Sequence, residues 1–227
     1  MVHRTDAHIN HLLPVTIENI TEYPLSGKEW RPVEILTHRG AILSRYYEAD
    51  KSRYAAVWIG GIGGDWDTPA RGLYPRLCDK LVYEQISSLR VRYRDPHDLD
   101  EAVHDTVAGV LFLQNRGIER IGVIGHSFGG AVAIQTALSN ANVKLVVTLA
   151  TQSYGTGMVG KVAHDCALLL IHGENDDILP PISSSYVHRQ AHKPKKLVIY
   201  PKATHNLDEV SEEVYVLVKE WIMRYVK

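Results

Sequence analysis

The sequence has few cysteines, little net charge and no long apolar run, and each shortage narrows the possible classes of protein. Its two cysteines, Cys78 and Cys166, fall in a predicted helix and a predicted strand, where we expect small buried hydrophobic side chains. Its 25 Lys and Arg residues nearly balance 26 Asp and Glu residues, which gives a net charge of −1. This balance does not favour nucleic acid or an anionic membrane as a partner.

Signals for membranes, export and metals are also missing from the sequence. No apolar run approaches the length of a membrane span, so we expect none. Residues 1–8 contain no apolar core of a signal peptide, so we expect a cytoplasmic protein. The 12 histidines form no H-E-x-x-H motif and no Cys/His cluster with zinc spacing. We therefore expect no metal and no organic cofactor, and the oligomeric state stays open.

The length and composition are those of one ordinary globular domain. The chain has 227 residues, of which 45% are hydrophobic and 22% are charged. Residues 1–30 show no regular pattern, and we expect either an N-terminal arm or an extra edge strand there. Residues 31–227 are expected to form a single domain, because no linker, repeat or low-complexity segment divides them.

From residue 33 onwards the sequence shows strand patterns that soon alternate with helix patterns. Residues 33–37 and 42–47 flank a short turn sequence and predict a β-hairpin. Residues 55–59 are apolar on both faces, which is typical of a central strand. Further strands are predicted at residues 86–93, 121–124, 143–149, 168–172 and 196–200. The pattern predicts an α/β fold: a mostly parallel central sheet with an antiparallel N-terminal edge hairpin and helices on both faces.

The strongest chemical signal lies where the predicted strand at 121–124 meets the helix that follows it. The intervening sequence is Gly125-His126-Ser127-Phe128-Gly129, which fits the pattern G-x-S-x-G. Between a strand and a helix this pattern is a nucleophile elbow, a strained turn that exposes its serine. Glycines flank the serine because the strand and the helix approach each other closely. Ser127 is therefore the candidate nucleophile, and an ordinary helix-capping serine is the alternative.

Two later strands are each followed by a residue type that a serine nucleophile requires. The serine needs a base within hydrogen-bond reach and a carboxylate that orients this base. Functional side chains of a parallel sheet gather beyond the carboxyl ends of its strands. Asp176 and Asp177 follow the strand at 168–172, and His205 follows the strand at 196–200. The order serine, aspartate, histidine is the one that accompanies this type of elbow.

Three stretches of the sequence resemble the α/β-hydrolase superfamily: G-H-S-F-G-G at residues 125–130, H-G-E-N-D-D-I-L-P at 172–180 and A-T-H-N-L at 203–207. The resemblance covers residues 33–227 and implies an α/β-hydrolase fold. It assigns Ser127 as nucleophile, His205 as base and Asp176 as acid, with Asp177 as the rival acid. Within the superfamily the chain resembles dienelactone-hydrolase-like and serine-aminopeptidase-like members. A dienelactone hydrolase carries a cysteine nucleophile, whereas this chain has Ser127.

A glycine run, Gly60-Gly61-Ile62-Gly63-Gly64, follows the predicted central strand. It resembles the superfamily's H-G-x-G-G, with Gly60 in place of the histidine. The resemblance implies that the backbone N–H groups of Ile62 and Phe128 form the oxyanion hole. The run matches neither the phosphate-loop pattern nor the dinucleotide pattern G-x-G-x-x-G, so it does not indicate a nucleotide cofactor.

Four residues near the predicted site are candidates for substrate contact: Gly61, His126, Arg94 and His97. Arg94 and His97 follow a strand on the side of the sheet that carries the predicted site. Arg94 would then offer a positive charge to a substrate that bears a carboxylate, and an ion pair with Asp95 or Asp98 is the alternative. Residues 150–167, where many superfamily members carry a helical lid, are short and rich in glycine. We therefore expect an open pocket and no lid domain.

These features together predict a small serine hydrolase with a small-molecule acyl substrate. Ser127, His205 and Asp176 would cleave a carboxylic ester or a thioester through an acyl-enzyme. An acyltransferase or a peptidase that uses the same triad is the first alternative. A binding or scaffold protein that keeps the fold without turnover is the second, because fold alone does not fix function.

Overall fold

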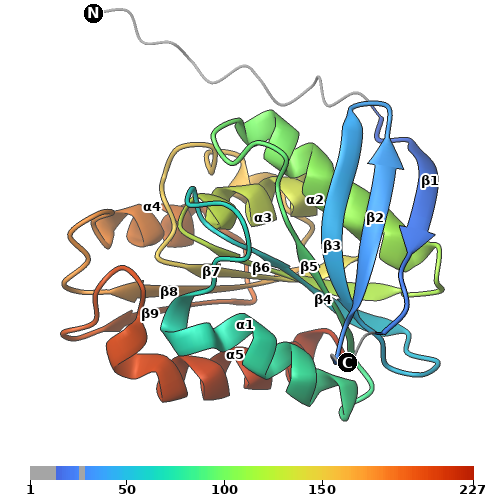
Figure 1. Ribbon diagram of the computed structural model, residues 1–227. Helices are drawn as coiled ribbons and strands as arrows, with labels where there is room; N and C mark the ends of the chain where they lie inside the picture. The colour runs from blue at the N-terminus through green and yellow to red at the C-terminus, as the bar shows by residue number, and fades with distance from the viewer. Residues whose placement is uncertain (1–13, 26–28) are drawn as a thin grey trace, which may run out of the picture.

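The computed structural model describes residues 14–25 and 29–227, and in these residues nine strands form one sheet (Figure 1). The spatial order of the strands is β1-β2-β3-β5-β4-β6-β7-β8-β9. Pairing is antiparallel from β1 to β5 and parallel from β5 to β9. The strands span Ile17–Glu22, Arg31–Thr37, Gly40–Tyr47, Tyr54–Ile59, Ser87–Val91, Arg120–His126, Val143–Leu149, Ala167–Gly173 and Lys195–Tyr200.

The antiparallel edge of the sheet confirms the predicted hairpin and adds one strand to it. β2 and β3 pair across a tight turn, with Thr37 opposite Gly40. β1 pairs with β2 and lies at the outer edge of the sheet (Figure 1). This strand falls in the region for which we expected an arm or an extra edge strand. Residues 1–13 of that region lie outside the described residues.

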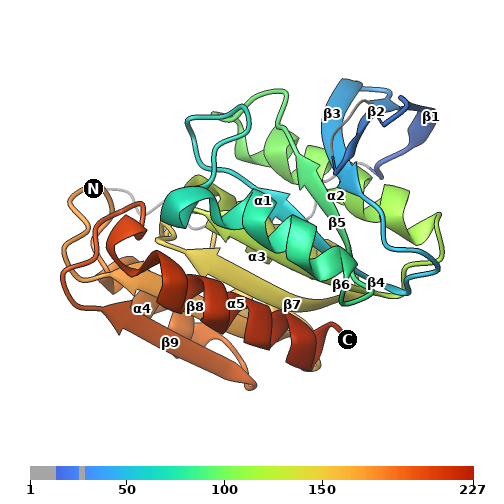
Figure 2. The same ribbon diagram turned by 60° about the horizontal axis from the view of Figure 1, so that its bottom comes forward.

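Helices cover both faces of the sheet, as the alternating pattern predicts (Figures 1 and 2). α2 (Leu99–Gln114), α3 (Phe128–Ser139) and α4 (Ile182–Gln190) lie on one face. α1 (Pro69–Val82) and α5 (Ser211–Tyr225) lie on the other. Each face buries its own cluster of apolar side chains, and β4, with five buried residues in a row, lies between them. No helix in the described part of the chain is both long and apolar enough to span a membrane.

The segment between β7 and β8 carries no lid domain. Within residues 150–166, all of which the structure describes, one short 3-10 helix at Val159–Lys161 is the sole helical element. The remainder of the segment is loop. The edge of the sheet that carries the candidate site therefore stays open, as the glycine-rich sequence predicts.

The start of α2 forms only half of the capping box that its sequence resembles. Asp98 Oδ1 accepts hydrogen bonds from the N–H groups of Asp100 and Glu101, at 3.0 and 3.1 Å. The Glu101 carboxylate does not return to the Asp98 N–H, because it pairs with Arg39 and Arg94 instead. The cap therefore depends on Asp98 alone, and the ion pair of Glu101 with Arg39 connects α2 to the hairpin.

The start of α1 is tied to a segment far away in the sequence. Ala70, Arg71 and Gly72 have left-handed backbone angles, with φ of 50°, 50° and 82°. The Ala70 N–H donates to the carbonyl of Asn206 at 2.7 Å, and the Arg71 N–H donates to the Asp208 carboxylate at 2.8 Å. These bonds hold the two segments together and offset the cost of the unusual backbone.

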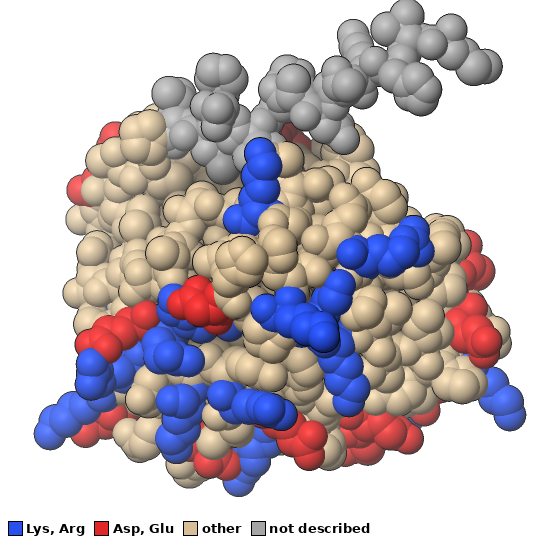
Figure 3. Space-filling model, turned by 180° about the vertical axis from the view of Figure 1, so that it is seen from behind, with Lys and Arg blue, Asp and Glu red and all other residues tan. Residues whose placement is uncertain are grey.

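Charges of both signs lie mixed on the face seen from behind. Figure 3 shows Lys and Arg side chains interspersed with Asp and Glu over the lower part of this face, and fewer charges above. This mixture agrees with the net charge of −1. A surface of this kind does not attract a polyanion by its overall field.

The crossing of β6 and α3 requires glycine at the positions where the motif has it. A Cβ added at Gly125 would lie 2.0 Å from the carbonyl oxygen of Gly129. A Cβ added at Gly129 would lie 2.4 Å from the carbonyl oxygen of Gly60. Both obstacles are backbone atoms, which cannot rotate away as a side chain can. The spacing of the motif therefore reflects the close approach of three backbone segments.

We expect Gly125→Ala to lower the free energy of unfolding by about 3 kcal/mol or more, because the new methyl group must displace the start of α3. For a chain of this size that loss corresponds to a fall in Tm of roughly 6–12 °C. Gly63→Ala is the matched control, because a Cβ at Gly63 meets no atom within 4 Å. Thermal and urea unfolding of both variants test this; equal stability of the two would contradict it.

Candidate active site

Ser127 lies at the turn between β6 and α3 in a strained backbone conformation. Its φ is 55° and its ψ is −117°, outside the regions that residues with a side chain normally occupy. The Ser127 N–H donates to the carbonyl of Leu149 on β7 at 2.8 Å, which holds the turn in place. The serine is 8% exposed. This is the geometry expected of a nucleophile elbow.

The loops after β8 and β9 bring Asp176 and His205 together. His205 Nδ1 lies 2.7 Å from Asp176 Oδ2, so the ring carries its proton on Nδ1 and donates it to the carboxylate. The other oxygen of Asp176 accepts from the N–H groups of Ile178 and Leu179, at 2.9 and 2.8 Å. In this tautomer of the neutral ring, Nε2 is the nitrogen that can accept a hydrogen bond.

These contacts favour the ionised form of Asp176. Its burial would raise the pKa of the carboxyl group, but the Leu179 N–H, the His205 ring and the Ile178 N–H together hold that pKa below its usual value. His172 Nε2 lies 3.0 Å from the same carboxylate, and burial lowers the pKa of this imidazole, so it is neutral at pH 7. Asp176 is thus a fixed carboxylate that orients the His205 ring.

The structure separates the two rival aspartates. Asp176 is 9% exposed and faces His205, whereas Asp177, the next residue, is exposed to solvent. The short loop folds back on itself because the Asp176 carboxylate caps its own Ile178 and Leu179 N–H groups. The adjacent side chain consequently points away from His205.

His126, one residue before the elbow serine, supports His205 and does not line the pocket described below. Its ring centroid lies 4.9 Å from that of His205, and its Nε2 donates to the His205 carbonyl at 3.1 Å. Burial, together with the neighbouring His205, lowers the pKa of His126 to about 4. Its Nδ1 is buried without a hydrogen-bond partner in the described residues, 3.9 Å from Asp67. A neutral ring thus fills the space under His205.

In the described residues, His205 is hydrogen-bonded to Asp176, but no hydrogen bond joins it to Ser127. Within residues 14–25 and 29–227, the Ser127 hydroxyl makes no hydrogen bond. Catalytic hydrogen bonds are often long in the absence of substrate and tighten when it binds. The assignment of Ser127 as nucleophile and His205 as its base therefore stays a prediction.

Two backbone N–H groups near Ser127 donate no hydrogen bond within the described part of the chain. Neither Ile62 nor Phe128 donates a backbone hydrogen bond to any described residue. Gly61 packs against the serine, since a Cβ at this glycine would lie 3.3 Å from Ser127 Cβ. The free donors are the groups that the sequence predicts for an oxyanion hole.

Arginines from β3 and β5 hold the loop that carries Ile62. The buried Arg90 donates to the carbonyl of Trp66 at 2.6 Å. The Arg45 guanidinium lies 3.9 Å from the centre of the Trp66 ring, and Arg92 pairs with Asp65 at 3.4 Å. Arg45 and Arg90 are opposite each other on paired strands, which like charges normally disfavour. This arrangement was not predicted from the sequence, although a charged residue in a strand with a buried pattern was the available signal.

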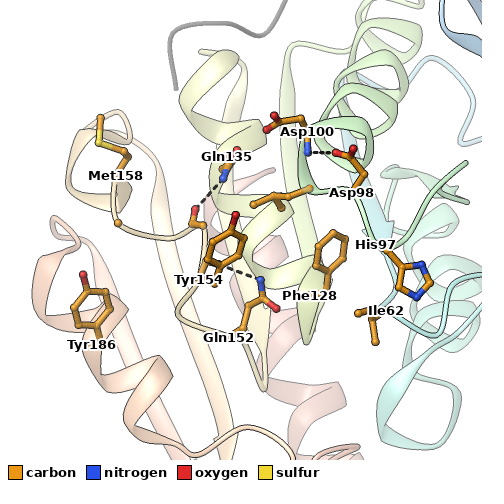
Figure 4. A pocket seen from close by; sticks show the side chains of 13 residues that line it. Ile62, His97, Asp98, Asp100, Phe128, Gln135, Gln152, Tyr154, Met158 and Tyr186 are labelled. Carbon is orange, nitrogen blue, oxygen red and sulfur yellow. Dashed lines mark hydrogen bonds between the residues drawn. The ribbon is translucent and has the colours of Figure 1, made fainter. Parts of the chain in front are cut away.

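A pocket of about 880 Å³ opens beside Ile62 and Phe128 (Figure 4). Figure 4 shows Phe128 and Tyr154 toward its middle, with Asp98 and Asp100 on one side. The other lining residues are Ile62, His97, Leu99, Gln135, Gln152, Gly155, Gly157, Met158 and Tyr186. The loop after β7 supplies five of the lining residues and α4 supplies Tyr186, and no motif in the sequence marked these six as pocket residues.

The structure places two of the predicted substrate-contact residues, His97 and Gly61, near the candidate site, and places Arg94 away from the pocket lining. His97 lines the pocket beside Ile62, and Gly61 lies against Ser127. Arg94 is absent from the lining, because its guanidinium pairs with Asp105 at 2.7 Å and with Glu101 at 2.5 Å. Arg94 thus pairs with Glu101 and Asp105 and not with Asp95 or Asp98, the two partners we had considered, and the described lining of the pocket lacks the positive charge that we expected.

Comparison with known proteins places the fold and the family. Residues 71–220 match the dienelactone hydrolase family. No curated protein matches the chain.

Within the described residues, no group of three or more His, Cys, Asp or Glu side chains is arranged to hold a metal ion.

Three solved structures illustrate the likeness of fold. A dienelactone hydrolase from Anabaena variabilis is 18% identical, with a TM-score of 0.74, over 92% of this chain and 99% of its own. An acetyl xylan esterase from Paenibacillus sp. R4 is 16% identical, with a TM-score of 0.73, over 96% and 91%. An alpha-beta serine hydrolase homologue from Coxiella burnetii is 15% identical, with a TM-score of 0.68, over 86% and 97%. The chain thus has the α/β-hydrolase fold over nearly its whole length.

The lowered pKa of His126 predicts a loss of stability in acid. Because the folded protein holds His126 neutral down to about pH 4, its contribution is complete above pH 6.5 and is lost as the pH falls toward 4. We expect the wild-type free energy of unfolding to fall by about 3 kcal/mol more than that of His126→Gln over this interval.

Urea unfolding at a series of pH values measures this difference. His97→Gln, which replaces a side chain that is 73% exposed, is the control and should follow the wild-type curve. Parallel curves for wild type and His126→Gln would show that His126 does not couple folding to pH.

Proposed function

Because this chain belongs to the dienelactone hydrolase family, we propose that it is a serine hydrolase that cleaves a carboxylic ester or thioester through an acyl-enzyme on Ser127. The family makes it a hydrolase that acts on ester bonds. The observation that carries the finer proposal is the buried pair of Asp176 and His205, with His205 contacted by the residue next to Ser127. A serine in place of the cysteine of a dienelactone hydrolase needs such a base, since its hydroxyl is a weak nucleophile at neutral pH.

The first half of the reaction forms the acyl-enzyme. Ser127 Oγ attacks the carbonyl carbon of the substrate while its proton moves to His205 Nε2. The carbonyl oxygen becomes negative and accepts hydrogen bonds from the N–H groups of Ile62 and Phe128. The intermediate collapses, the bond to the leaving oxygen or sulfur breaks, and His205 gives its proton to that leaving group.

The second half returns the enzyme to its starting state. Water attacks the acyl carbon and gives a proton to His205, and the same two N–H groups stabilise the second intermediate. The bond to Ser127 Oγ then breaks, and His205 returns the proton to the serine. Throughout, the ionised Asp176 holds the ring in the tautomer with hydrogen on Nδ1 and stabilises the charged imidazole.

Ser127→Ala tests the nucleophile. We expect the wild type to react covalently with a fluorophosphonate probe and to hydrolyse 4-nitrophenyl esters, and the variant to do neither. Mass spectrometry of the labelled protein should locate the probe on Ser127. A wild type that takes up no probe and turns over no ester would refute the proposal and favour a binding role for the fold.

Asp176→Asn and Asp177→Asn form a matched pair that tests the acid. Asp176→Asn should lower kcat by about 10³- to 10⁴-fold, because an amide neither stabilises the imidazolium nor selects its tautomer. Asp177→Asn, one residue away and exposed, should stay within about twofold of wild type. Steady-state kinetics on one ester settle the point, and equal losses in the two variants would reject Asp176 as the acid.

A further inference from the structure

The pocket beside Ile62 and Phe128 has carboxylates on its wall and no fixed cation. Asp98 and Asp100 line it, and none of the described lining residues is Lys or Arg (Figure 4). The nearby Arg94 does not offset this charge, because Asp105 and Glu101 already neutralise its guanidinium. The pocket is therefore unfavourable for an anionic group.

Each of the two amide side chains of the pocket uses one N–H in a hydrogen bond to a backbone carbonyl and keeps its oxygen free as an acceptor. Gln135 Nε2 donates to the carbonyl of Gly155 at 3.0 Å, and Gln152 Nε2 donates to the carbonyl of Tyr154 at 3.1 Å. The side-chain oxygens of both glutamines accept no hydrogen bond from a described residue. Each has two lone pairs that a ligand can use.

The aspartates add further acceptors to this wall. One carboxylate oxygen of Asp98 accepts the hydrogen bonds that cap α2, and the second oxygen accepts no hydrogen bond from the described residues. Asp100 uses its backbone N–H in the same cap, and its carboxylate is exposed. Four acceptor-bearing side chains thus come together around an apolar floor that includes Phe128 and Tyr154.

We propose that this pocket selects an ester whose bound group is uncharged or cationic and carries hydrogen-bond donors, such as hydroxyl or ammonium groups, and that it rejects a carboxylate. The proposal rests on the proposed function, because it assigns the pocket to the substrate of Ser127. Donors on the ligand pair with the free oxygens of Gln135, Gln152 and Asp98, and its apolar parts pack on Phe128 and Tyr154. A carboxylate in the same place meets the like charges of Asp98 and Asp100.

Matched esters that differ only in charge test this selectivity. One series has 4-nitrophenyl esters of hexanoate, of adipate with one free carboxylate, and of 6-(trimethylammonio)hexanoate. A second series has acetate esters of phenols whose side chains end in an amide, a carboxylate or an ammonium group. The two series place the charge on the acyl side and on the alcohol side, so that either orientation in the pocket is covered.

We expect kcat/KM for the anionic ester to be about five- to tenfold below that of its neutral partner in at least one series at low ionic strength. Added salt should reduce this difference in kcat/KM, because Asp98 and Asp100 are exposed and dissolved ions screen their charges. In Asp98→Asn/Asp100→Asn the ratio of anionic to neutral kcat/KM should rise toward one. Asparagine still caps α2, so the variant should keep its fold, and its Tm is the check on this.

The control variant removes the same two charges elsewhere. Glu213→Gln/Glu220→Gln lies on α5, on the opposite face of the sheet, and should leave the charge ratio at its wild-type value. Equal rates for anionic and neutral esters in both series, or a ratio that Asp98→Asn/Asp100→Asn does not change, would overturn the proposal. Failure of the proposed function gives a different result, since then no ester of either series is hydrolysed and Ser127 takes up no probe.

Discussion

The close approach of β6, α3 and the loop after β4 is the constraint on which the candidate site depends. Gly125 and Gly129 have no side chain because a backbone oxygen occupies the place where each Cβ would lie. This contact forces Ser127 into a backbone conformation that a residue with a side chain rarely adopts. It also brings Gly61 against the serine, so that the nucleophile and the loop with the free N–H of Ile62 are positioned by one packing contact.

Electrostatics around the site follow from burial combined with a few directed hydrogen bonds. Asp176 stays ionised in a buried position because two N–H groups and an imidazole donate to it. His126 has no such partner for its Nδ1, and burial therefore keeps that ring neutral. One buried group is thus held charged and another uncharged, and His205 contacts both of them.

The sequence predicted those parts of the fold and site that are encoded locally. The elbow at residues 125–129, the hairpin and the positions of Asp176 and His205 all depend on short patterns whose physical meaning is fixed by neighbouring residues. The ion pairs of Arg94 could not be predicted in this way, because its partners Glu101 and Asp105 become neighbours only when α2 packs back beside the end of β5. The pocket wall was equally hidden, since Gln135, Tyr154 and Tyr186 come from three separate segments with no shared pattern.

The left-handed start of α1 couples the local unfolding of two loops of the candidate site. The Ala70 and Arg71 N–H groups are bonded to Asn206 and Asp208, just beyond His205, while the same helix follows the loop that carries Ile62. The loop that carries His205 and the helix that follows the Ile62 loop are therefore joined by two hydrogen bonds, one to a backbone carbonyl and one to a carboxylate. A fluctuation that opens one loop must break bonds held by the other, so the two behave as one cooperative unit of local unfolding. Residues more than 130 positions apart along the chain therefore belong to the same unit of local unfolding.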